Sequence, residues 1–81
     1  MSKGVKSFRR DMKTRKLLRF LTKNDFHSVG GTKHGKYRRE GDDHSMTVPR
    51  HPRITPPTAE SICKDLVIKH GFTEDEVLRI F

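Results

Sequence analysis

Three short segments with the features of β-strands lie between two segments with helical periodicity, and this order limits the folds open to the chain. The strand-like segments cover residues 26–30, 34–39 and 44–48. The last of them alternates apolar and polar residues, which is typical of a strand with one buried face. Glycines and acidic residues between the segments indicate turns. The pattern therefore predicts three short strands joined in succession.

Helical patterns flank these strands on both sides. Residues 14–24 place leucines on one face and basic residues elsewhere. Residues 57–70 repeat apolar side chains at helical spacing. Thr73 and Glu76 have the spacing of a capping box, so residues 74–80 are expected to form a short last helix.

The predicted fold class is α+β, with the order α-β-β-β-α and a short C-terminal helix. A chain of 81 residues is expected to form a single domain with a thin core. The helices are expected on one face of a three-stranded antiparallel sheet, the layout of a double-stranded-RNA-binding domain. Residues 1–11 are predicted to be a basic, partly disordered extension before a domain at 12–81, with Met12 as a second plausible start. Four prolines in residues 49–57 predict a stiff, extended loop.

Basic residues are concentrated in the first half of the chain. Residues 1–39 hold 13 basic and 2 acidic residues, whereas residues 40–81 hold 5 basic and 8 acidic ones, which gives the net charge of +8. This bias favours a surface that binds nucleic-acid phosphates. No basic segment has a wide apolar face, which disfavours membrane binding. No apolar run has the length of a signal or membrane segment, so a cytoplasmic location is expected.

Cysteine and histidine spacing argues against a metal site. The single cysteine, Cys63, excludes an internal disulfide and a Cys-rich zinc site, and its apolar neighbours suggest that it is buried. No two of the five histidines have the i, i+4 spacing of a helical metal site. We therefore expect neither a metal nor an organic cofactor.

His34 differs from the other histidines in its setting. Glycines precede and follow it, and four cations lie within five positions: Lys33, Lys36, Arg38 and Arg39. RNA can be cut without a protein nucleophile, because its own 2′-hydroxyl attacks the phosphate. The protein must then supply a proton acceptor, a proton donor and positive charge. Imidazole, with an ordinary pKa of about 6.5, can take either proton role. Residue chemistry alone leaves open whether His34 is catalytic or contacts phosphate in a non-catalytic loop.

Four segments, in their order and spacing, resemble the sequence motifs of a known protein family. They are Met12-Lys13-Thr14-Arg15-Lys16-Leu17-Leu18 ending in Lys23-Asn24-Asp25-Phe26; Gly31-Thr32-Lys33-His34 with Tyr37-Arg38; Val48-Pro49-Arg50-His51; and Pro57-Thr58-Ala59 through Ile62, Cys63 and Lys64 to Gly71. Together they resemble the motifs of HicA-type toxins, over roughly residues 12–72. The chain departs from the family pattern in residues 1–11 and in Asp25, which stands where the family commonly has glycine.

The resemblance implies a function. HicA-type toxins are mRNA interferases of type II toxin–antitoxin systems: metal-independent endoribonucleases on a double-stranded-RNA-binding-like fold that inhibit translation and growth. Their catalytic histidine maps onto His34, and the implied protein partner is a HicB-type antitoxin that covers the His34 face. The residues expected to bind RNA are Lys33, Lys36, Arg38, Arg39, Arg50 and His51. For His51, shaping its loop or contacting phosphate is favoured over a second proton-transfer role.

Two alternatives belong to other classes of function. A non-catalytic RNA-binding module with the same fold explains the charge and the order of elements equally well. Such modules usually carry a basic helix N-terminus, which the sequence PPTAE at residues 56–60 lacks. A structural subunit, such as a small ribosomal-type protein, has only the charge in its favour.

Overall fold

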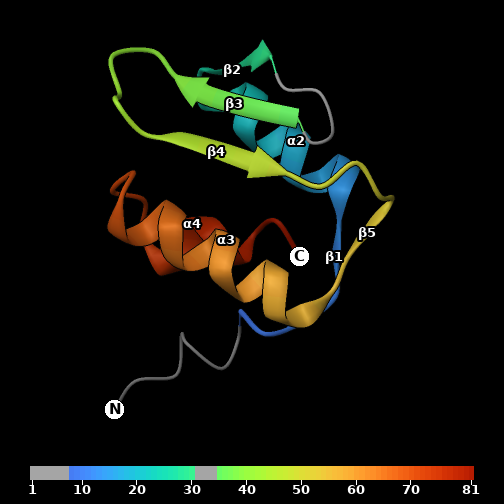
Figure 1. Cartoon of the computed structure of the whole chain (residues 1–81). Coiled ribbons are helices and arrows are strands. Elements are labelled where there is room, and N and C mark those ends of the chain that lie inside the picture. The colour runs from blue at the N-terminus through green and yellow to red at the C-terminus, as the bar shows by residue number, and fades with distance from the viewer. Residues whose placement is uncertain (1–7, 31–34) are drawn as a thin grey trace.

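The computed structural model describes residues 8–30 and 35–81, and its central feature is a three-stranded antiparallel sheet in the order β2-β3-β4 (Figure 1). The strands are β2 (Phe26–Gly30), β3 (Gly35–Arg39) and β4 (Ser45–Val48). They lie between α2 (Thr14–Lys23) and α3 (Pro56–Ile68), and α4 (Glu74–Leu78) follows. The predicted α+β class and the antiparallel sheet are confirmed.

Only one face of the sheet is buried. Phe26, Met46 and Val48 point into the core, whereas Ser45 and Thr47 of the same strand as Met46 are exposed. Strand pairing places Ser28 opposite Tyr37, and Tyr37 opposite Met46. Side chains alternate between the two faces of a strand. One face therefore packs on the core, and the other faces solvent.

The helix α2 packs its leucines inward, as the periodicity predicts. Leu17 and Leu21 are fully buried. The helix ends where Asn24 donates a hydrogen bond from Nδ2 to the carbonyl oxygen of Phe20, at 2.8 Å. Asp25 follows with φ 69°, in the left-handed region that Asn and Asp tolerate better than most residues. The helix predicted over residues 14–24 is thus confirmed.

The C-terminal helices follow the predicted order. Prolines at the start of α3 fit its first turn, where a backbone N–H has no helical partner. Thr73 and Glu76 form the predicted capping box, in which the Thr73 Oγ1 accepts a hydrogen bond from the Glu76 N–H at 3.1 Å. The helix that they begin ends at Leu78 rather than at residue 80, but Ile80 still packs in the core at 2% exposure.

A second, two-stranded pairing was not predicted from the sequence. Strand β1 (Met12–Lys13) pairs antiparallel with β5 (Arg53–Ile54), with Met12 opposite Ile54. The segment 49–57, predicted as a loop, therefore contains a short strand. A two-residue strand has no periodicity of its own, and its partner lies far along the chain, so local pattern gives no sign of it.

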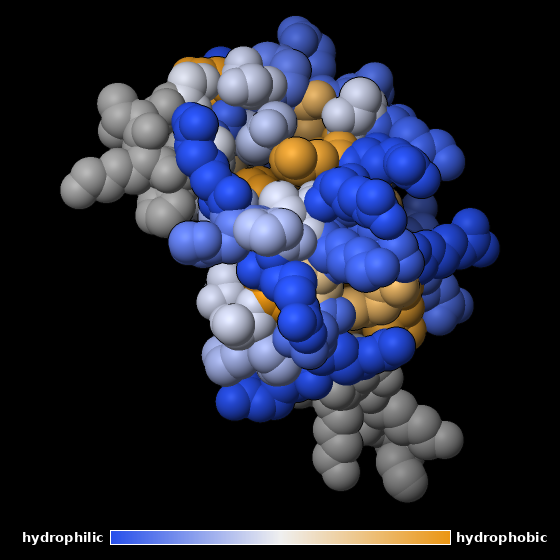
Figure 2. Space-filling view, turned by 90° about the vertical axis from the view of Figure 1, so that its right-hand side faces the viewer, coloured by the Kyte–Doolittle hydropathy of each residue, from blue (hydrophilic) through white to orange (hydrophobic). Residues whose placement is uncertain are grey.

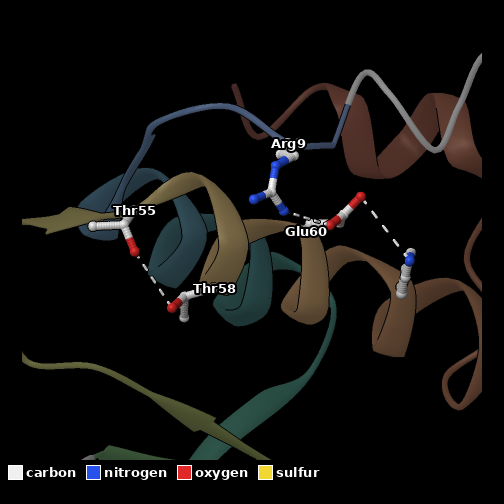
Figure 3. Close-up of polar contacts among 5 residues, drawn as sticks. Arg9, Thr55, Thr58 and Glu60 are labelled. Atoms are coloured by element: carbon white, nitrogen blue, oxygen red, sulfur yellow. Dashed lines mark hydrogen bonds and ion pairs between the residues drawn. The ribbon is translucent and has the colours of Figure 1, made fainter.

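The N-terminal residues that the structure describes are fastened to the rest of the chain. Phe8 is 2% exposed and belongs to the core. The Arg9 Nη1 lies 3.0 Å from Glu60 Oε1 on α3 (Figure 3), and Arg53 pairs with Asp11 at 3.0 Å. Packing therefore includes residues 8–11, ahead of the domain boundary predicted at residue 12.

Candidate nucleic-acid interface

Strand β3 presents two cations on the uncovered face of the sheet. Lys36 and Arg38 are both exposed and alternate with inward-facing residues. Arg38 stands opposite His27 on β2, and Lys36 stands opposite Thr47 on β4. Neither cation forms an ion pair with another residue in the described ranges. Both cations can attract phosphate. Arg38 shares a hollow with the carboxylates of Glu40, Asp42 and Asp43, which compete for it, whereas Lys36 lies nearer the start of β3.

His34 and Lys33 lie outside the described residues. In sequence they belong to the segment 31–34, which connects β2 to β3. The local structure explains why glycine stands on either side of that segment. Gly30 adopts φ 113°, and a Cβ on Gly35 would lie 3.0 Å from Cε1 of Tyr37. A side chain is strained at the first position and crowded at the second.

A hollow lies at the end of the sheet where β3 begins. Its lining includes Gly35 and Tyr37 of β3, Ser28 of β2 and Arg50 from the segment after β4. The start of α2 contributes Thr14 to the same hollow. The structure thus brings Arg50, predicted to bind RNA, beside the residue that follows His34 in the sequence.

His51 is exposed but does not line this hollow among the described residues. Its backbone carbonyl accepts a hydrogen bond from the Thr14 hydroxyl. This bond fixes the loop after β4 against the start of α2. Because this bond involves the backbone and not the imidazole, both roles expected of the His51 side chain, shaping the loop and contacting phosphate, stay predictions.

Arg39 points in a different direction from Lys36 and Arg38. Its side chain lies on the covered side of the sheet, where Nη1 donates a hydrogen bond to the His70 carbonyl oxygen at 3.1 Å. Its guanidinium also lies 4.7 Å from the centre of the Phe72 ring. Successive residues of a strand point to opposite faces, so Arg38 and Arg39 cannot share one. These contacts fasten the sheet to the end of α3. The RNA contact expected of Arg39 stays a prediction, and it would lie on the other face from that of Arg38.

Three polar residues near the β3–β4 turn form a cluster that the sequence did not indicate. The buried His70 places Nδ1 2.7 Å from Oδ2 of Asp42, and its ring lies edge-on to that of His44. The His44 backbone N–H donates to Asp42 Oδ1 at 3.1 Å. This bond, followed by the one from His70, holds the pKa of Asp42 below its ordinary value of 3.8. An ionised Asp42 therefore ties the turn to the end of α3.

This cluster is separate from the end of the sheet where β3 begins at Gly35. The His70 side chain is 1% exposed, too little to reach a substrate. His44 stands at the turn of the β3–β4 hairpin, whereas Gly35 pairs with Val48 at the opposite end. Strands of this length separate the two ends by more than hydrogen-bonding distance. His44 and Gly35 therefore belong to different ends of the sheet.

Neither metal ligation nor thiol chemistry is supported by the described part of the chain. It contains no group of three His, Cys, Asp or Glu side chains able to hold a metal ion. Cys63 is fully buried, as predicted, and burial raises the pKa of its thiol to about 12. A thiol in this state is a poor nucleophile, because the thiolate is the reactive form.

The side of the molecule that carries β1 and β5 is strongly hydrophilic (Figure 2). Hydrophobic residues appear there only in gaps between hydrophilic ones. No helix in residues 8–30 and 35–81 is long and apolar enough to cross a membrane. Comparisons of the chain with protein-family models, with curated proteins and with solved structures give no match.

Proposed function

We propose that this chain is a metal-independent endoribonuclease that cleaves mRNA, the toxin of a type II toxin–antitoxin pair. One observation carries the proposal: His34 directly precedes β3, and the outward side chains of β3 are the exposed cations Lys36 and Arg38. Arg50 adds a cation at the end of the sheet where β3 begins, because it lines the hollow with Gly35. Arg38 lies toward the other end, opposite Ser45. A histidine close in sequence to several cations supplies the residue types that RNA cleavage needs, a proton-transfer group and positive charge.

The proposed chemistry uses the RNA as its own nucleophile. The 2′-oxygen forms a bond to the adjacent phosphorus while the bond from phosphorus to the 5′-oxygen breaks. A base removes the 2′-hydroxyl proton, and an acid protonates the departing 5′-oxygen. His34 takes one of these proton roles, and nearby cations stabilise the added negative charge on the phosphate. The products are a 2′,3′-cyclic phosphate and a 5′-hydroxyl, and the reaction requires no metal.

The order of elements supports the proposed fold and partner. A helix, three antiparallel strands and a second helix occur in the order of a double-stranded-RNA-binding domain. In the proposal, a HicB-type antitoxin covers the His34 face and blocks the access of RNA to it. The open face of the sheet, which bears Lys36 and Arg38, is free of covering elements in the described chain and suits such a partner. The proposed site of action is the cytoplasm, where mRNA is translated.

Replacing His34 by alanine tests the catalytic assignment. Purified His34→Ala protein should fold normally and lose at least about 100-fold in RNA cleavage, the size of effect expected for one acid–base group. It should also lose growth inhibition in cells. The matched control is His51→Ala, another histidine removal, whose cleavage rate should fall far less. Cleavage by His34→Ala at the wild-type rate would overturn the assignment.

The same assay separates the enzyme from a non-catalytic RNA-binding module. Total RNA is incubated with the wild-type protein in the presence of a metal chelator. Fragments with 2′,3′-cyclic phosphate ends support the proposed enzyme. Intact RNA that nevertheless shifts on a native gel supports the module.

A further inference from the structure

A basic groove runs between α2 and α4, away from the open face of the sheet. Apolar side chains of Phe20 and Ile80 lie in it. The cations that line it are Lys16, Arg19 and Lys23 of α2 and Arg79 after α4. Three of them follow one another along α2 at spacings of three and four residues, so they lie along one side of the helix.

The charges of α2 oppose its own stability as a helix. The ten residues of α2 include no acidic residue, and its first turn has none to favour the helix dipole. Like charges three or four positions apart repel each other and destabilise a helix. In contrast, α3 pairs its lysines: Lys64 with Glu60 and Lys69 with Asp65, each at i, i+4. The row of cations without acidic neighbours is therefore a feature of α2 that α3 does not share.

The cations of the groove are available to an external anion. Arg19, Lys23 and Arg79 form no ion pair within the described ranges. The one carboxylate in the lining, Glu76, accepts hydrogen bonds at Oε1 from the Thr73 N–H at 2.9 Å and hydroxyl at 3.1 Å. Its Oε1 is therefore occupied in capping α4, although its negative charge still attracts Arg79. Lys16 donates to the Phe81 carbonyl oxygen at 3.1 Å, which holds it at the groove.

We propose that this groove binds the phosphate backbone of the RNA substrate, at a site separate from the cleavage site. This inference rests on the proposed function and adds the path of the RNA strand. From Lys16 to Lys23 the helix rises about 10 Å, so the row suits an extended chain of phosphates better than a single anion. The same helix borders the hollow that contains Arg50, because Thr14 and Leu18 line it. These two residues lie on nearly the opposite side of α2 from Lys16, Arg19 and Lys23, because a helix turns by about 100° per residue. The groove is therefore a second RNA-contacting surface on the same helix.

The test compares two double variants that each remove two positive charges. Arg19→Gln/Lys23→Gln alters the groove, and Lys64→Gln/Lys69→Gln alters the outer side of α3. The probe is a short single-stranded 2′-O-methyl RNA, which lacks the attacking hydroxyl and is not cleaved. Its affinity is measured over a range of salt concentrations. The groove variant should lower the slope of log affinity against log salt by about 1.4, since each lost contact with single-stranded nucleic acid contributes about 0.7.

The control variant should keep the wild-type slope. Thermal melts verify folding, and the groove variant should melt close to the wild type, because relieved repulsion within α2 offsets the loss of the favourable Lys23 charge in its last turn. If the wild type binds RNA and both variants keep the wild-type salt slope, the groove proposal is wrong and the proposed function still stands. Absence of RNA binding by the wild type overturns the proposed function as well. Binding of polyglutamate is measured for the same variants. If the groove variant loses polyglutamate binding but keeps its RNA binding, the proposal is overturned in favour of an acidic protein partner.

Discussion

Replacing Phe8 by alanine tests how far the folded domain extends toward the N-terminus. The sequence predicts a charged extension up to residue 11, but Phe8 is 2% exposed within the core. Truncating a buried phenylalanine to alanine typically costs about 3–5 kcal/mol of unfolding free energy, from lost burial and the remaining cavity. A domain of 81 residues has a total stability of about 4–12 kcal/mol. The substitution should therefore remove a large share of the stability.

The expected loss is measurable by thermal and urea denaturation followed by circular dichroism. For a domain of this size, each kcal/mol shifts the melting temperature by about 4–8 °C, so Phe8→Ala should lower it by at least about 12 °C. The urea midpoint should fall while the slope of the transition stays the same, because the surface exposed on unfolding hardly changes.

Two controls isolate the role of the ring. Phe8→Leu keeps most of the apolar contact and should recover much of the loss. Arg9→Ala removes a neighbouring side chain that is 56% exposed, and its ion pair with Glu60 should contribute at most about 1 kcal/mol. A chain that begins at Phe8 should also melt well above one that begins at Met12. A Phe8→Ala variant within about 0.5 kcal/mol of the wild type, the range of ordinary surface substitutions, would refute the reasoning.

Two further predictions concern titratable groups. Asp42 has a lowered pKa in the fold, so its contribution to stability is present above its unfolded value of 3.8 and is lost as the pH falls through the lower folded value. Asp42→Asn should therefore reduce the urea midpoint at pH 7 and give a flatter decline below about pH 4; a decline parallel to that of the wild type would contradict this. The Cys63 pKa is raised from 9.0 to about 12, so its contribution is present below pH 9 and is lost as the pH rises toward 12. The native thiol should resist a disulfide reagent at pH 8 and react once the protein is unfolded in guanidinium, and rapid labelling of the native protein would show that the burial is wrong.

The sequence by itself determined the local elements of this protein. Helical periodicity located α2 and α3, and the capping-box spacing of Thr73 and Glu76 located the start of α4. Alternation and turn residues located the three strands. These signals are informative because a helix or strand buries one side. Apolar residues therefore recur along the sequence with the period of that element.

For the candidate site, the sequence supplied the residue types but not all of their directions. It singled out Lys36 and Arg38, which lie together on the open face of β3. It grouped Arg39 with them, although strand alternation turns that side chain to the opposite face, where it bonds to His70. Period-2 alternation from Arg38 would have given this result, because it applies to every strand residue.

Only the tertiary structure decided the contacts between distant segments. It paired Met12 with Ile54, placed Phe8 in the core and joined Asp42 to His70. It also set α2 beside α4, which formed the basic groove. Each of these contacts depends on how whole elements pack, and many packings share the same local pattern. Local periodicity therefore fixes which elements form, whereas the burial of their apolar faces against one another fixes which residues meet.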